Sequence, residues 1–445
     1  MKILFIQSYL GRKEPSVMPL GILMVATMLK DHEVAVYDPN ISDDPYGGLK
    51  KKLSEFRPDV VGISIRNIDN QQGVDFFYYY KTLRPTLAII KETAPAARVM
   101  AGGAGFSIFA KTIMERVSEI DYGVYLEGEE AVPELLRNLD SPEKVKGIYY
   151  RKNGKVMFTG VRSLPDFERL PFARKDLVDL KKYSGKGGIG IQTKRGCAYR
   201  CTYCTYPYLN GSKLRMRTPE NVVDEIEDLV RRGITHFMFS DALFTIPLRH
   251  AEAICREILR RKLKVEWFAW AEPKLITREF LELARDAGCV YIAYSTDALS
   301  SGALKVLGKN FTEADVVKVY NLAKEVDGIK TGFCFFVGAP EETVAGLFKM
   351  VVFFIKGNIV LRLKRKGGIG LNWIRIEPET GVYNYAVSKG VIKKDADLLP
   401  EGDVKEADLF YVHPPLKSLS RVVKVLLVAM NSSLSLINKF RHAHG

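Results

Sequence analysis

Residues 197–204 read Cys-Ala-Tyr-Arg-Cys-Thr-Tyr-Cys, so three of the six cysteines of the chain fall within eight residues. A structural zinc ion needs a fourth ligand, and no further Cys or His lies near this run. A [4Fe–4S] cluster held by three cysteines leaves one iron open to another ligand. The predicted metal ligands are therefore Cys197, Cys201 and Cys204. The other cysteines lie in apolar segments and are interpreted as core residues: Cys255, Cys289 and Cys334.

The stretch from residue 186 to residue 390 alternates short apolar strands with helices. Such alternation predicts a parallel sheet with helices packed on it. The predicted strands are Gly188–Lys194, Thr235–Phe239, Val265–Ala271, Cys289–Tyr294, Lys330–Val337 and Gly370–Ile376. The cysteine run follows the first of these strands, and the active sites of β/α barrels lie at the carboxyl ends of the strands. Thr218 and Pro219 then predict the N-cap and the first residue of a helix.

The first 140 residues form a separate α/β unit. The predicted strands are Lys2–Gln7, Val34–Tyr37, Val60–Ile65, Arg98–Ala101 and Gly123–Leu126. Short apolar strands separated by helices imply a doubly wound, Rossmann-like parallel sheet that is covered on both faces. Ligands bind beyond the carboxyl ends of such strands. Glycines there let a flat ligand approach the backbone, but they serve equally well in ordinary turns. A dinucleotide site is disfavoured, because Gly-x-Gly-x-x-Gly does not follow the first strand.

The composition, 47% apolar and 27% charged, is that of a globular protein and excludes wholesale disorder or collagen-like repeats. A chain of 445 residues suits two or three domains. We predict a ligand-binding domain over 1–140, a linker over 141–185, a barrel over 186–390 and a mostly helical C-terminal segment over 391–445. Within that last segment, Ser418–Phe440 reads as one or two amphipathic helices.

The cysteine spacing, with Tyr203 directly before the third cysteine, resembles that of the radical S-adenosylmethionine (SAM) superfamily. Gly338–Thr343 and Glu377–Gly381 also resemble motifs of that superfamily, whereas Ser295-Thr296-Asp297 departs from its usual Glu-Ser. The resemblance implies a partial, TIM-like (β/α)6 barrel in which SAM chelates the open iron. It implies that SAM is bound by Tyr203, Ser240, Asp297 and Gly338.

Taken with the cysteines, the N-terminal unit resembles the cobalamin-binding domain of the B12-dependent radical SAM enzymes. The Asp-x-His-x-x-Gly motif that supplies a histidine to cobalt in other B12 proteins is absent from the chain, and His32, the only histidine of this unit, is interpreted as a surface residue. The resemblance therefore implies that cobalamin binds without a protein imidazole. The residues that it places at the cobalamin are Leu20, Gly21, Arg66, Asn67, Gly102, Gly103, Gly105, Phe106, Glu127 and Gly128.

Arg66-Asn67-Ile68-Asp69-Asn70 resembles the same segment in the subgroup that includes tryptophan 2-C-methyltransferase. An arginine stays protonated and cannot ligate cobalt. Under the corrin, its charge would discourage a lower axial ligand and favour departure of a methyl cation. The alternative is that Arg66 binds a phosphate or a carboxamide.

The resemblance implies methyl transfer, in which SAM methylates reduced cobalamin and methylcobalamin then methylates a carbon of a small-molecule, peptide or lipid-like substrate. The transfer would be radical, or polar with a base that removes a proton. Glu272 is the candidate for this base or for a substrate anchor, because burial tunes a carboxylate toward a neutral pKa; a solvated loop acid is the alternative. Weaker catalytic candidates at comparable strand ends are Tyr206, Asp241 and Tyr294.

Three other functions stay open at this point. A B12 radical enzyme that does not methylate would catalyse cyclisation, ring rearrangement or oxygen insertion. An RNA-modifying iron–sulfur enzyme would use the basic segments, but the chain lacks an appended RNA-binding module. A cofactor-binding sensor would catalyse no turnover.

The net charge of +14 is concentrated in two segments. Residues 151–200 carry 13 Lys and Arg against 4 Asp and Glu, and residues 351–400 carry 9 against 4. These segments are expected to flank the active-site entrance, where an anionic substrate or an acidic electron donor such as flavodoxin or ferredoxin would dock. We expect a monomer and no nucleic-acid partner.

The start of the chain has no small-residue cleavage site, and no uninterrupted apolar run approaches the roughly 18–20 residues of a spanning helix. The predicted location is cytoplasmic. Peripheral contact with a membrane is an alternative role for the C-terminal amphipathic helices, which carry Arg421 and Lys424.

Overall fold

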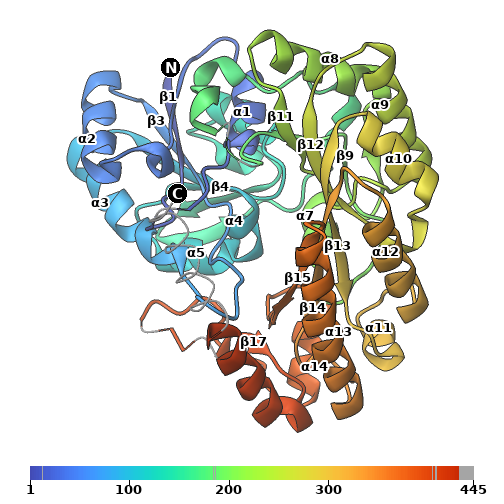
Figure 1. Ribbon diagram of the computed structural model, residues 1–445. Coiled ribbons are helices and arrows are strands. Elements are labelled where there is room, and N and C mark those ends of the chain that lie inside the picture. Colours follow the sequence, from blue (N-terminus) through green and yellow to red (C-terminus); the bar gives the residue numbers. More distant parts are fainter. Residues whose placement is uncertain (13, 184, 186, 403, 406–407, 430–445) are drawn as a thin grey trace, which may run out of the picture.

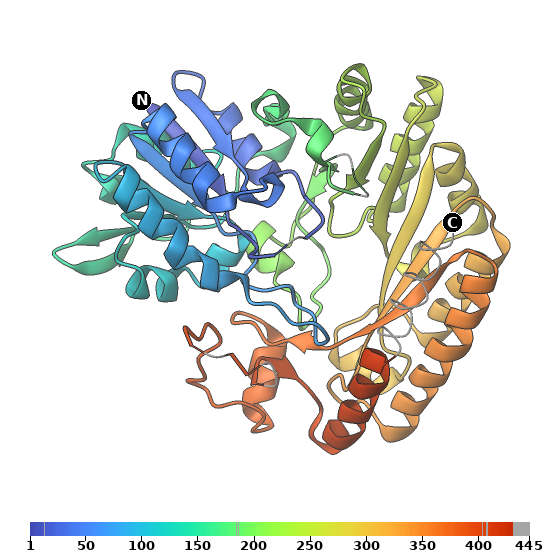
Figure 2. The same cartoon turned by 60° about the vertical axis from the view of Figure 1, so that its left-hand side comes forward.

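The computed structural model describes residues 1–12, 14–183, 185, 187–402, 404–405 and 408–429. Two parallel sheets form its body, one built by the N-terminal third of the chain and one by residues 190–372 (Figure 1). Figure 2 shows the two α/β units side by side, with the red C-terminal segment at the end where they meet. The described segments before and after the barrel contact both units.

The first sheet has seven strands in the order β2-β1-β3-β4-β5-β6-β7. The pairs from β2 to β5 are parallel, and β6 and β7 are added antiparallel. A parallel sheet with this order reverses direction between β1 and β3, and ligands bind outside the carboxyl ends of the strands at such a point. The strands are β1 (Lys2–Gln7), β2 (Glu33–Tyr37), β3 (Val60–Ser64), β4 (Arg98–Gly102), β5 (Tyr122–Val124), β6 (Ile148–Lys152) and β7 (Lys155–Phe158).

Helices cover both faces of this sheet, so the doubly wound prediction is confirmed. Side chains of β1 alternate between the faces: Leu4 and Ile6 join the core beneath α2, α3 and α5, whereas Ile3 and Phe5 pack with α1 and α6. The helices are α1 (Leu20–Thr27), α2 (Pro45–Phe56), α3 (Leu83–Thr93), α4 (Ala104–Ile108), α5 (Ala110–Arg116) and α6 (Ala131–Arg137).

The predicted linker over 141–185 begins with a β-hairpin, β6 and β7, that belongs to the first sheet. Asn153 and Gly154 form its turn with φ angles of 51° and 75°. An Asn-Gly pair between two apolar runs is the usual signal for such a turn, because both central residues need a positive φ. The prediction overlooked this signal, and the first unit extends to Phe158.

The second sheet has six strands in the order β15-β14-β13-β12-β11-β8, and every neighbouring pair is parallel. The predicted partial barrel is therefore confirmed, with β8 and β15 as its unpaired edges. The strands are β8 (Gly190–Ile191), β11 (His236–Phe239), β12 (Glu266–Ala271), β13 (Cys289–Asp297), β14 (Lys330–Phe336) and β15 (Gly367–Asn372).

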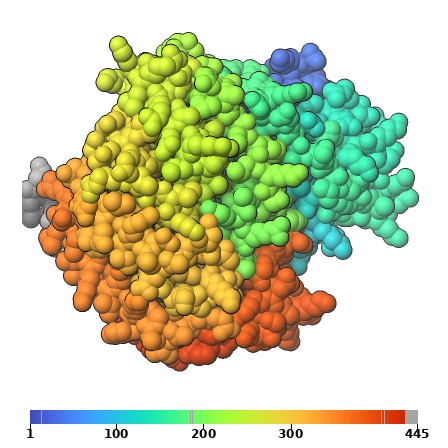
Figure 3. Space-filling view, turned by 90° about the vertical axis from the view of Figure 1, so that its right-hand side faces the viewer, coloured from blue at the N-terminus to red at the C-terminus, as the bar shows by residue number. Residues whose placement is uncertain are grey.

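Helices lie on the outside of this barrel, and Figure 3 shows the face that they form, from green α8 to orange α13. Thr218 caps α8 as predicted, since its side chain accepts a hydrogen bond from the Asn221 N–H at 3.2 Å. The helices are α8 (Pro219–Arg231), α9 (Leu248–Arg260), α10 (Arg278–Asp286), α11 (Ser301–Val306), α12 (Glu313–Glu325) and α13 (Val344–Leu363).

Helix α13 is two turns longer than predicted, because the sequence pattern placed its end at Ile355. Residues 356–363 therefore belong to the barrel, and β15 begins at Gly367, three residues before the predicted strand. The most apolar 18-residue stretch of α13 has a mean hydropathy of 1.9, so among the described helices α13 is the one long and apolar enough to cross a membrane. It connects β14 to β15 within the sheet, however, and thus forms part of the folded domain.

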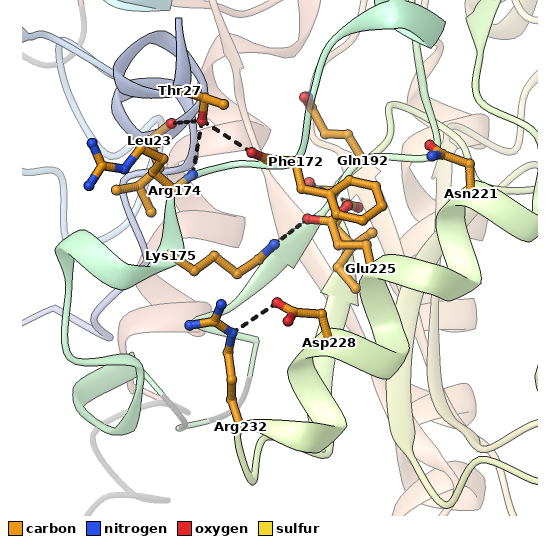
Figure 4. Close-up of polar contacts among 12 residues, drawn as sticks. Leu23, Thr27, Phe172, Arg174, Lys175, Gln192, Asn221, Glu225, Asp228 and Arg232 are labelled. Carbon is orange, nitrogen blue, oxygen red and sulfur yellow. Dashed lines mark hydrogen bonds and ion pairs between the residues drawn. The ribbon is translucent and has the colours of Figure 1, made fainter. Parts of the chain in front are cut away.

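The chain between the two units is held by hydrogen bonds to a helix of each (Figure 4). On α1, the Thr27 hydroxyl donates to the Phe172 carbonyl at 3.1 Å and accepts from the Arg174 N–H at 3.0 Å. On α8, the buried Glu225 carboxylate pairs with the buried Lys175 ammonium. This segment thereby ties α1 of the first unit to α8 of the second.

The segment after the barrel combines a helix, a short strand and irregular chain. Helix α14 (Gly381–Ser388) follows β16 (Ile374–Arg375), which pairs antiparallel with β17 (Phe410–Tyr411). Residues 417–429 are helical, as predicted, and Trp373 Nε1 donates to Ser420 Oγ at 2.7 Å on that helix. The rest of the predicted Ser418–Phe440 helix, from residue 430 on, lies outside the described residues.

Candidate functional site

The three cysteines lie on a loop that is closed at its base by two short antiparallel strands, β9 (Lys194–Arg195) and β10 (Arg215–Met216). Gly196 begins the loop with a φ of +88°, and a Cβ there would lie 2.1 Å from the Lys213 carbonyl oxygen. Only glycine fits this close approach of two chains. Helix α7 (Tyr206–Asn210) follows the third cysteine, and the hydroxyl of Tyr208 on this helix forms a hydrogen bond with the Tyr125 hydroxyl of the first unit.

Two distant segments clamp the loop at Thr202. The Thr202 N–H donates to the Leu307 carbonyl at 3.1 Å, and the Val382 N–H donates to the Thr202 carbonyl at 2.8 Å. A Cβ on Gly381 would lie 3.0 Å from the Thr202 Cβ, so a small residue is needed at this contact. The Glu377–Gly381 motif thus holds the cysteine loop, which explains a glycine at its end.

The three thiols are free and interact electrostatically with one another. Burial raises the pKa of Cys197 and of Cys201, and raises that of Cys204 to about 12. Among the described residues, no group of three His, Cys, Asp or Glu side chains is arranged to hold one metal ion. In a cubane cluster each cysteine binds a different iron, so the sulfurs need not share one ion. The donor set fits the predicted [4Fe–4S] cluster.

A buried lysine that the sequence analysis missed lies beside the cysteines. The Lys309 ammonium pairs with the Asp297 carboxylate and donates to the Tyr203 hydroxyl at 3.0 Å, and Tyr203 donates to Asp297 at 2.7 Å. Burial opposes the charge of Lys309, but Asp297 and the thiols of Cys201 and Cys204 raise its pKa above the ordinary value. The ammonium therefore stays charged next to the cluster ligands.

Tyr203 and Asp297, both predicted SAM-binding residues, meet in this cluster of side chains. Asp297 ends β13 with a φ of 60° and is 2% exposed. Their contact with SAM stays a prediction, and the pairing with Lys309 gives Asp297 an electrostatic role as well.

A cavity of about 410 Å³ lies between the strand ends of the first sheet and the mouth of the barrel. It brings together nine of the predicted site residues from both units: Leu20, Gly21, Arg66, Gly102, Gly103, Glu127, Gly128, Tyr206 and Ser240. A Cβ on Gly21 would meet no atom within 4 Å, so the cavity reaches the α1 backbone at this glycine. Open backbone at strand ends fits a large, flat group such as cobalamin.

Three residues predicted at the cobalamin do not line this cavity. Phe106 is fully buried in the core of the first unit. The Gly105 N–H donates to the Arg66 carbonyl at 2.9 Å, and a Cβ on Gly105 would lie 3.1 Å from the Asn67 backbone. Gly105 and Asn67 thus pack against each other, because the chain turns sharply after β3 and β4, and they support the Arg66 backbone.

Arg66 lies at the end of β3 and is exposed to the cavity. Of the described residues that line the cavity, none is a histidine. Binding of cobalamin without a protein imidazole, and the role of the Arg66 charge, stay predictions.

Glu127 connects the two units through an ion-pair network. Its carboxylate pairs with Arg195 at 2.8 Å and with Arg215, and Glu129 pairs with the same Arg195 at 2.6 Å. Both arginines belong to the β9–β10 ribbon at the base of the cysteine loop. The glutamates predicted beside cobalamin therefore orient the cluster loop against the first unit.

This network changes the interpretation of the basic segment 151–200. Lys175, Lys194 and Arg195 are buried and paired with Glu225, Asp241 and Glu127 or Glu129. The prediction that these charges face partners at the active-site entrance is wrong for those three residues, because acids of neighbouring elements neutralise them inside the protein.

Glu272 lies at the carboxyl end of β12 and is 2% exposed. Its Oε2 accepts from the Leu275 N–H at 3.0 Å, whereas its buried Oε1 has no partner among the described residues. Burial raises the pKa of Glu272, and the Leu275 N–H opposes this shift. An unpaired carboxylate oxygen at the barrel mouth fits the predicted base or anchor and excludes the solvated-acid alternative.

Tyr206 and Ser240 line the cavity, as their predicted roles require. The buried Tyr206 hydroxyl has no partner among the described residues, and burial raises the pKa of Tyr206 above its ordinary range. The Tyr206 N–H donates to Cys204 Sγ at 3.4 Å, so this tyrosine connects the cavity to the cysteine loop.

The surroundings of Asp241 favour a structural role over the predicted catalytic one. Its Oδ1 accepts from the N–H groups of Thr193 and Lys194, and its Oδ2 accepts from the Thr193 hydroxyl and the Lys194 ammonium. Both oxygens are occupied at the point where β8 leads into β9.

The surroundings of Tyr294 and Gly338 also favour structural roles over the predicted catalytic and SAM-binding ones. Tyr294 packs beside Phe333 with a ring separation of 5.2 Å, and Phe333 contacts Tyr320 of α12, so Tyr294 lies in the core between sheet and helices. The Gly338 carbonyl accepts from the His413 N–H at 2.8 Å, so Gly338 holds the C-terminal segment. Side-chain alternation along β13 assigned Tyr294 to the helix side, which a strand end alone does not reveal.

Glu377 is a further buried acid that the sequence analysis named only as part of a motif. It is 8% exposed and accepts from Gln71 Nε2 at 3.0 Å across the two units. Burial raises its pKa to about 7, although Arg375 opposes this shift. Arg375 itself pairs with Asp69 at 2.9 Å. No local signal marks these contacts, because the partners lie some 300 positions apart in the chain.

Two family models match the chain. The radical SAM superfamily matches residues 191–352, and the B12 binding domain matches residues 9–136. The first match contains the three cysteines and the second contains the strand ends that line the cavity.

Curated relatives align with most of the chain. An uncharacterized methyltransferase of Pyrococcus horikoshii is 27% identical over 334 residues, which are 73% of this chain and 70% of that protein. Tryptophan 2-C-methyltransferase of Streptomyces laurentii is 26% identical, over 73% of this chain and 65% of that protein.

A solved structure has the same fold. The radical SAM methyltransferase of Kitasatospora setae, with tryptophan and a SAM analogue bound, superposes with a TM-score of 0.77 at 22% identity, over 94% of this chain and 87% of that one. The same enzyme with cobalamin and a [4Fe–4S] cluster bound gives a TM-score of 0.73 at 23% identity.

The fold and the site define the class of this protein: it is a radical SAM protein with an N-terminal B12-binding domain. Within the radical SAM superfamily, the chain belongs with the cobalamin-dependent members, and it is similar to the tryptophan-methylating enzymes of Streptomyces laurentii and Kitasatospora setae.

Proposed function

We propose that the protein is a cobalamin-dependent radical SAM methyltransferase that transfers a methyl group from SAM to a carbon of a small molecule. The observation that carries this proposal is the cavity between the units, which collects residues of the B12-binding domain and of the barrel around one space. When bound, SAM and cobalamin would supply the methyl group and its carrier, and the cluster would supply an electron.

The residues of the chain have separable tasks in this proposal. Cys197, Cys201 and Cys204 hold the cluster, and Lys309 places a positive charge beside it. Arg66 lines the cavity beyond the end of β3 and would place a positive charge against cobalamin held there. The ion pairs of Glu127 and Glu129 hold the cluster loop against the B12-binding domain.

We propose that Glu272 binds or deprotonates the substrate. Its unpaired Oε1 lies at the end of a barrel strand, where substrates of such barrels bind. A raised pKa suits a group that accepts a proton near neutral pH.

Tryptophan is the first substrate to test, since two relatives act on it according to their names. A peptide or lipid-like substrate is the next to test. We further propose a cytoplasmic monomer that receives electrons from a flavodoxin or a ferredoxin; the free thiols of the cluster loop suit a reducing compartment.

The test uses the full chain with its cluster reconstituted, cobalamin, a reductant and SAM that carries a deuterated methyl group. Mass spectrometry should detect the label first on cobalamin and then on the methylated substrate. 5′-Deoxyadenosine without label on cobalamin would favour a non-methylating radical enzyme, and the absence of both products would favour a sensor.

Replacement of Glu272 by Gln tests the role of this carboxylate. We expect methylation to fall by about 10²–10⁴-fold, the usual contribution of a positioned general base, while label still reaches cobalamin. The exposed Glu55 in α2 provides the control variant Glu55→Gln, which should retain full activity. Undiminished methylation by Glu272→Gln would remove the base from the proposal.

A further inference from the structure

Helix α13 exposes an apolar stripe along its outer side. Its members are 57%, 70%, 47%, 55% and 80% exposed, in chain order Val344, Phe348, Ile355, Ile359 and Leu363. Successive members are four or seven residues apart, which is one or two helical turns, so the stripe follows one face of the helix. Apolar side chains this large and this exposed seldom gather on one face of a soluble domain.

The opposite side of α13 is also apolar and packs against the barrel. Its buried residues include Leu347, Met350, Phe354 and Leu361. A helix that is apolar on all sides is normally surrounded by protein or by lipid. In the most apolar 18-residue stretch of α13, only 39% of the residues are buried inside the protein, so the outer face of the helix lacks the apolar environment that its composition suits.

The helix formed by residues 417–429 presents a second apolar face. Val423 and Leu427 are buried beneath it, and Leu427 lines a cavity together with Phe354 and Arg362 of α13. Figures 1 and 2 both show this red helix at the same end of the molecule as α13. Its exposed apolar residues are Leu419, Val422, Val425, Leu426 and Val428. These five residues and the five of α13 are here named the docking face.

The two helices of the docking face carry cations and no acidic residue. The described chain contains no Asp or Glu between residues 344 and 376 or between residues 409 and 429. The exposed cations on the two helices are Lys349, Lys356, Arg362, Lys364, Lys417 and Arg421. Among them, Lys349 pairs with Glu313 of α12.

We propose that the docking face binds the surface of an anionic lipid bilayer. Apolar side chains would enter the boundary between headgroups and acyl chains, and the cations at the margins would contact anionic headgroups. Because α13 connects two neighbouring strands of the barrel, it lies in the plane of the interface and does not span the bilayer. This inference does not depend on the proposed methyl transfer.

The charge of the docking face selects lipid over a second copy of this chain. A symmetric dimer would bring two cationic margins together, and like charges at an interface oppose association. An anionic lipid surface complements these charges and also accepts an irregular apolar face.

The test is co-flotation of the full chain with vesicles of phosphatidylcholine and phosphatidylglycerol at a ratio of 7:3, compared with vesicles of phosphatidylcholine alone. We expect binding to the anionic vesicles at low salt, weaker binding at high salt, and little binding to the neutral vesicles. No binding to the anionic vesicles at low salt would overturn the proposal.

Two variants locate the contact. The double variant Phe348→Glu, Leu363→Glu should reduce the partition coefficient by at least about tenfold, because it puts two carboxylates where apolar groups meet lipid. The double variant Lys356→Gln, Arg362→Gln should reduce it by about 25-fold on anionic vesicles, roughly fivefold for each cation removed.

The matched control is Val161→Glu, which changes a 64% exposed apolar residue of the segment between the units. This control should bind vesicles as the parent chain does. All variants should keep the thermal midpoint and the cofactor content of the parent chain. Equal binding by Phe348→Glu, Leu363→Glu and by the control would overturn the proposal. The proposal would also be overturned if the parent chain formed a dimer and bound no vesicles, while this double variant was monomeric. That result would assign the docking face to a second copy of the chain.

Discussion

At the scale of single residues, burial between the two units decides the chemistry of several side chains. Glu377 reaches Gln71 of the B12-binding domain and lies within contact of Thr205, the residue after the third cysteine. Lys309 is charged because Asp297 lies beside it in a site that excludes water. Replacement of either residue should therefore change a measurable property of the site, the pH dependence of stability for Glu377 and the reduction potential of the cluster for Lys309.

Glu377 should make the stability of the protein depend on pH. Its folded pKa of about 7 lies above its ordinary value of 4.5, so the folded protein holds a proton that the unfolded chain releases. Stability therefore falls as the pH rises from 4.5 to 7, by up to about 3 kcal/mol, and stays lower above that range. Glu377→Gln should abolish this loss and raise the thermal midpoint at pH 8.

The control for this prediction is Glu379→Gln, which changes an exposed acid two residues away. Thermal melts of the parent and both variants at several pH values between 4 and 8 make the measurement. Parallel pH profiles for Glu377→Gln and the parent chain would show that Glu377 does not titrate in this range.

Lys309 should set the reduction potential of the cluster. A positive charge beside the ligands stabilises the reduced, more negative cluster, so Lys309→Met should lower the midpoint potential on the order of tens of millivolts. Lys309→Arg, which retains the charge, serves as the control. Redox titration followed by electron paramagnetic resonance measures the potential, and an unchanged or higher value in Lys309→Met would contradict the assignment.

At the scale of elements, the β9–β10 ribbon connects the cluster loop to the B12-binding domain. Its two arginines form ion pairs with Glu127 and Glu129. The side chains of Arg195, Glu127 and Glu129 are at most 8% exposed. Ion pairs so deeply buried hold geometry well, because an unpaired member would be left without water. The cluster loop is therefore positioned by the domain that it faces.

Replacement of one arginine should show that the position of the cluster loop depends on these ion pairs. Arg195→Met leaves Glu129 without its cation, and we expect the free energy of unfolding to fall by roughly 3–5 kcal/mol. Arg169→Met is the matched control, since Arg169 is 87% exposed in its pair with Asp166 and should contribute less than about 1 kcal/mol. Denaturant titration and proteolysis of the cluster loop measure the difference; equal effects of the two variants would refute the prediction.

At the scale of the whole molecule, the two sheets present their carboxyl ends to a common space. The 410 Å³ cavity lies in this space, and at Gly21 the α1 backbone itself forms its wall. The segment between the units and the C-terminal segment hold this arrangement through contacts such as Lys175 with Glu225 and Arg375 with Asp69.

A side chain at Gly21 should obstruct cobalamin while it leaves the fold intact. Gly21→Leu improves helix propensity by up to about 1 kcal/mol and meets no protein atom, so the thermal midpoint of the cobalamin-free protein should not fall. Cobalamin affinity should drop at least about tenfold, which corresponds to ~1.4 kcal/mol. Gly402→Leu, which also meets no protein atom and lies outside the cavity, is the control.

Titration followed by the absorbance of cobalamin measures this affinity. Unchanged binding by Gly21→Leu would place cobalamin elsewhere than in the cavity between the units.

Local sequence by itself predicted the cysteine ligands, the two α/β units and the N-cap of α8. These features depend on residues a few positions apart: the spacing within 197–204, the alternation of apolar strands with helices, and caps such as Thr218. Two errors are also local. The Asn153-Gly154 turn was assigned to a linker, and the basic stretch from Lys356 onward was not assigned to α13.

Only the tertiary structure decided which side chains meet. Lys309 lies more than 100 positions from Cys201, and Glu377 lies about 300 positions from Gln71, so no spacing could place them together. Asp241 follows a strand end as Glu272 does, and Tyr294 lies inside β13, which runs on to Asp297. The direction of the Tyr294 side chain and the partners around Asp241 assign both residues to the core. Packing brings such groups out of water, and burial rather than residue type then sets their charge and their function.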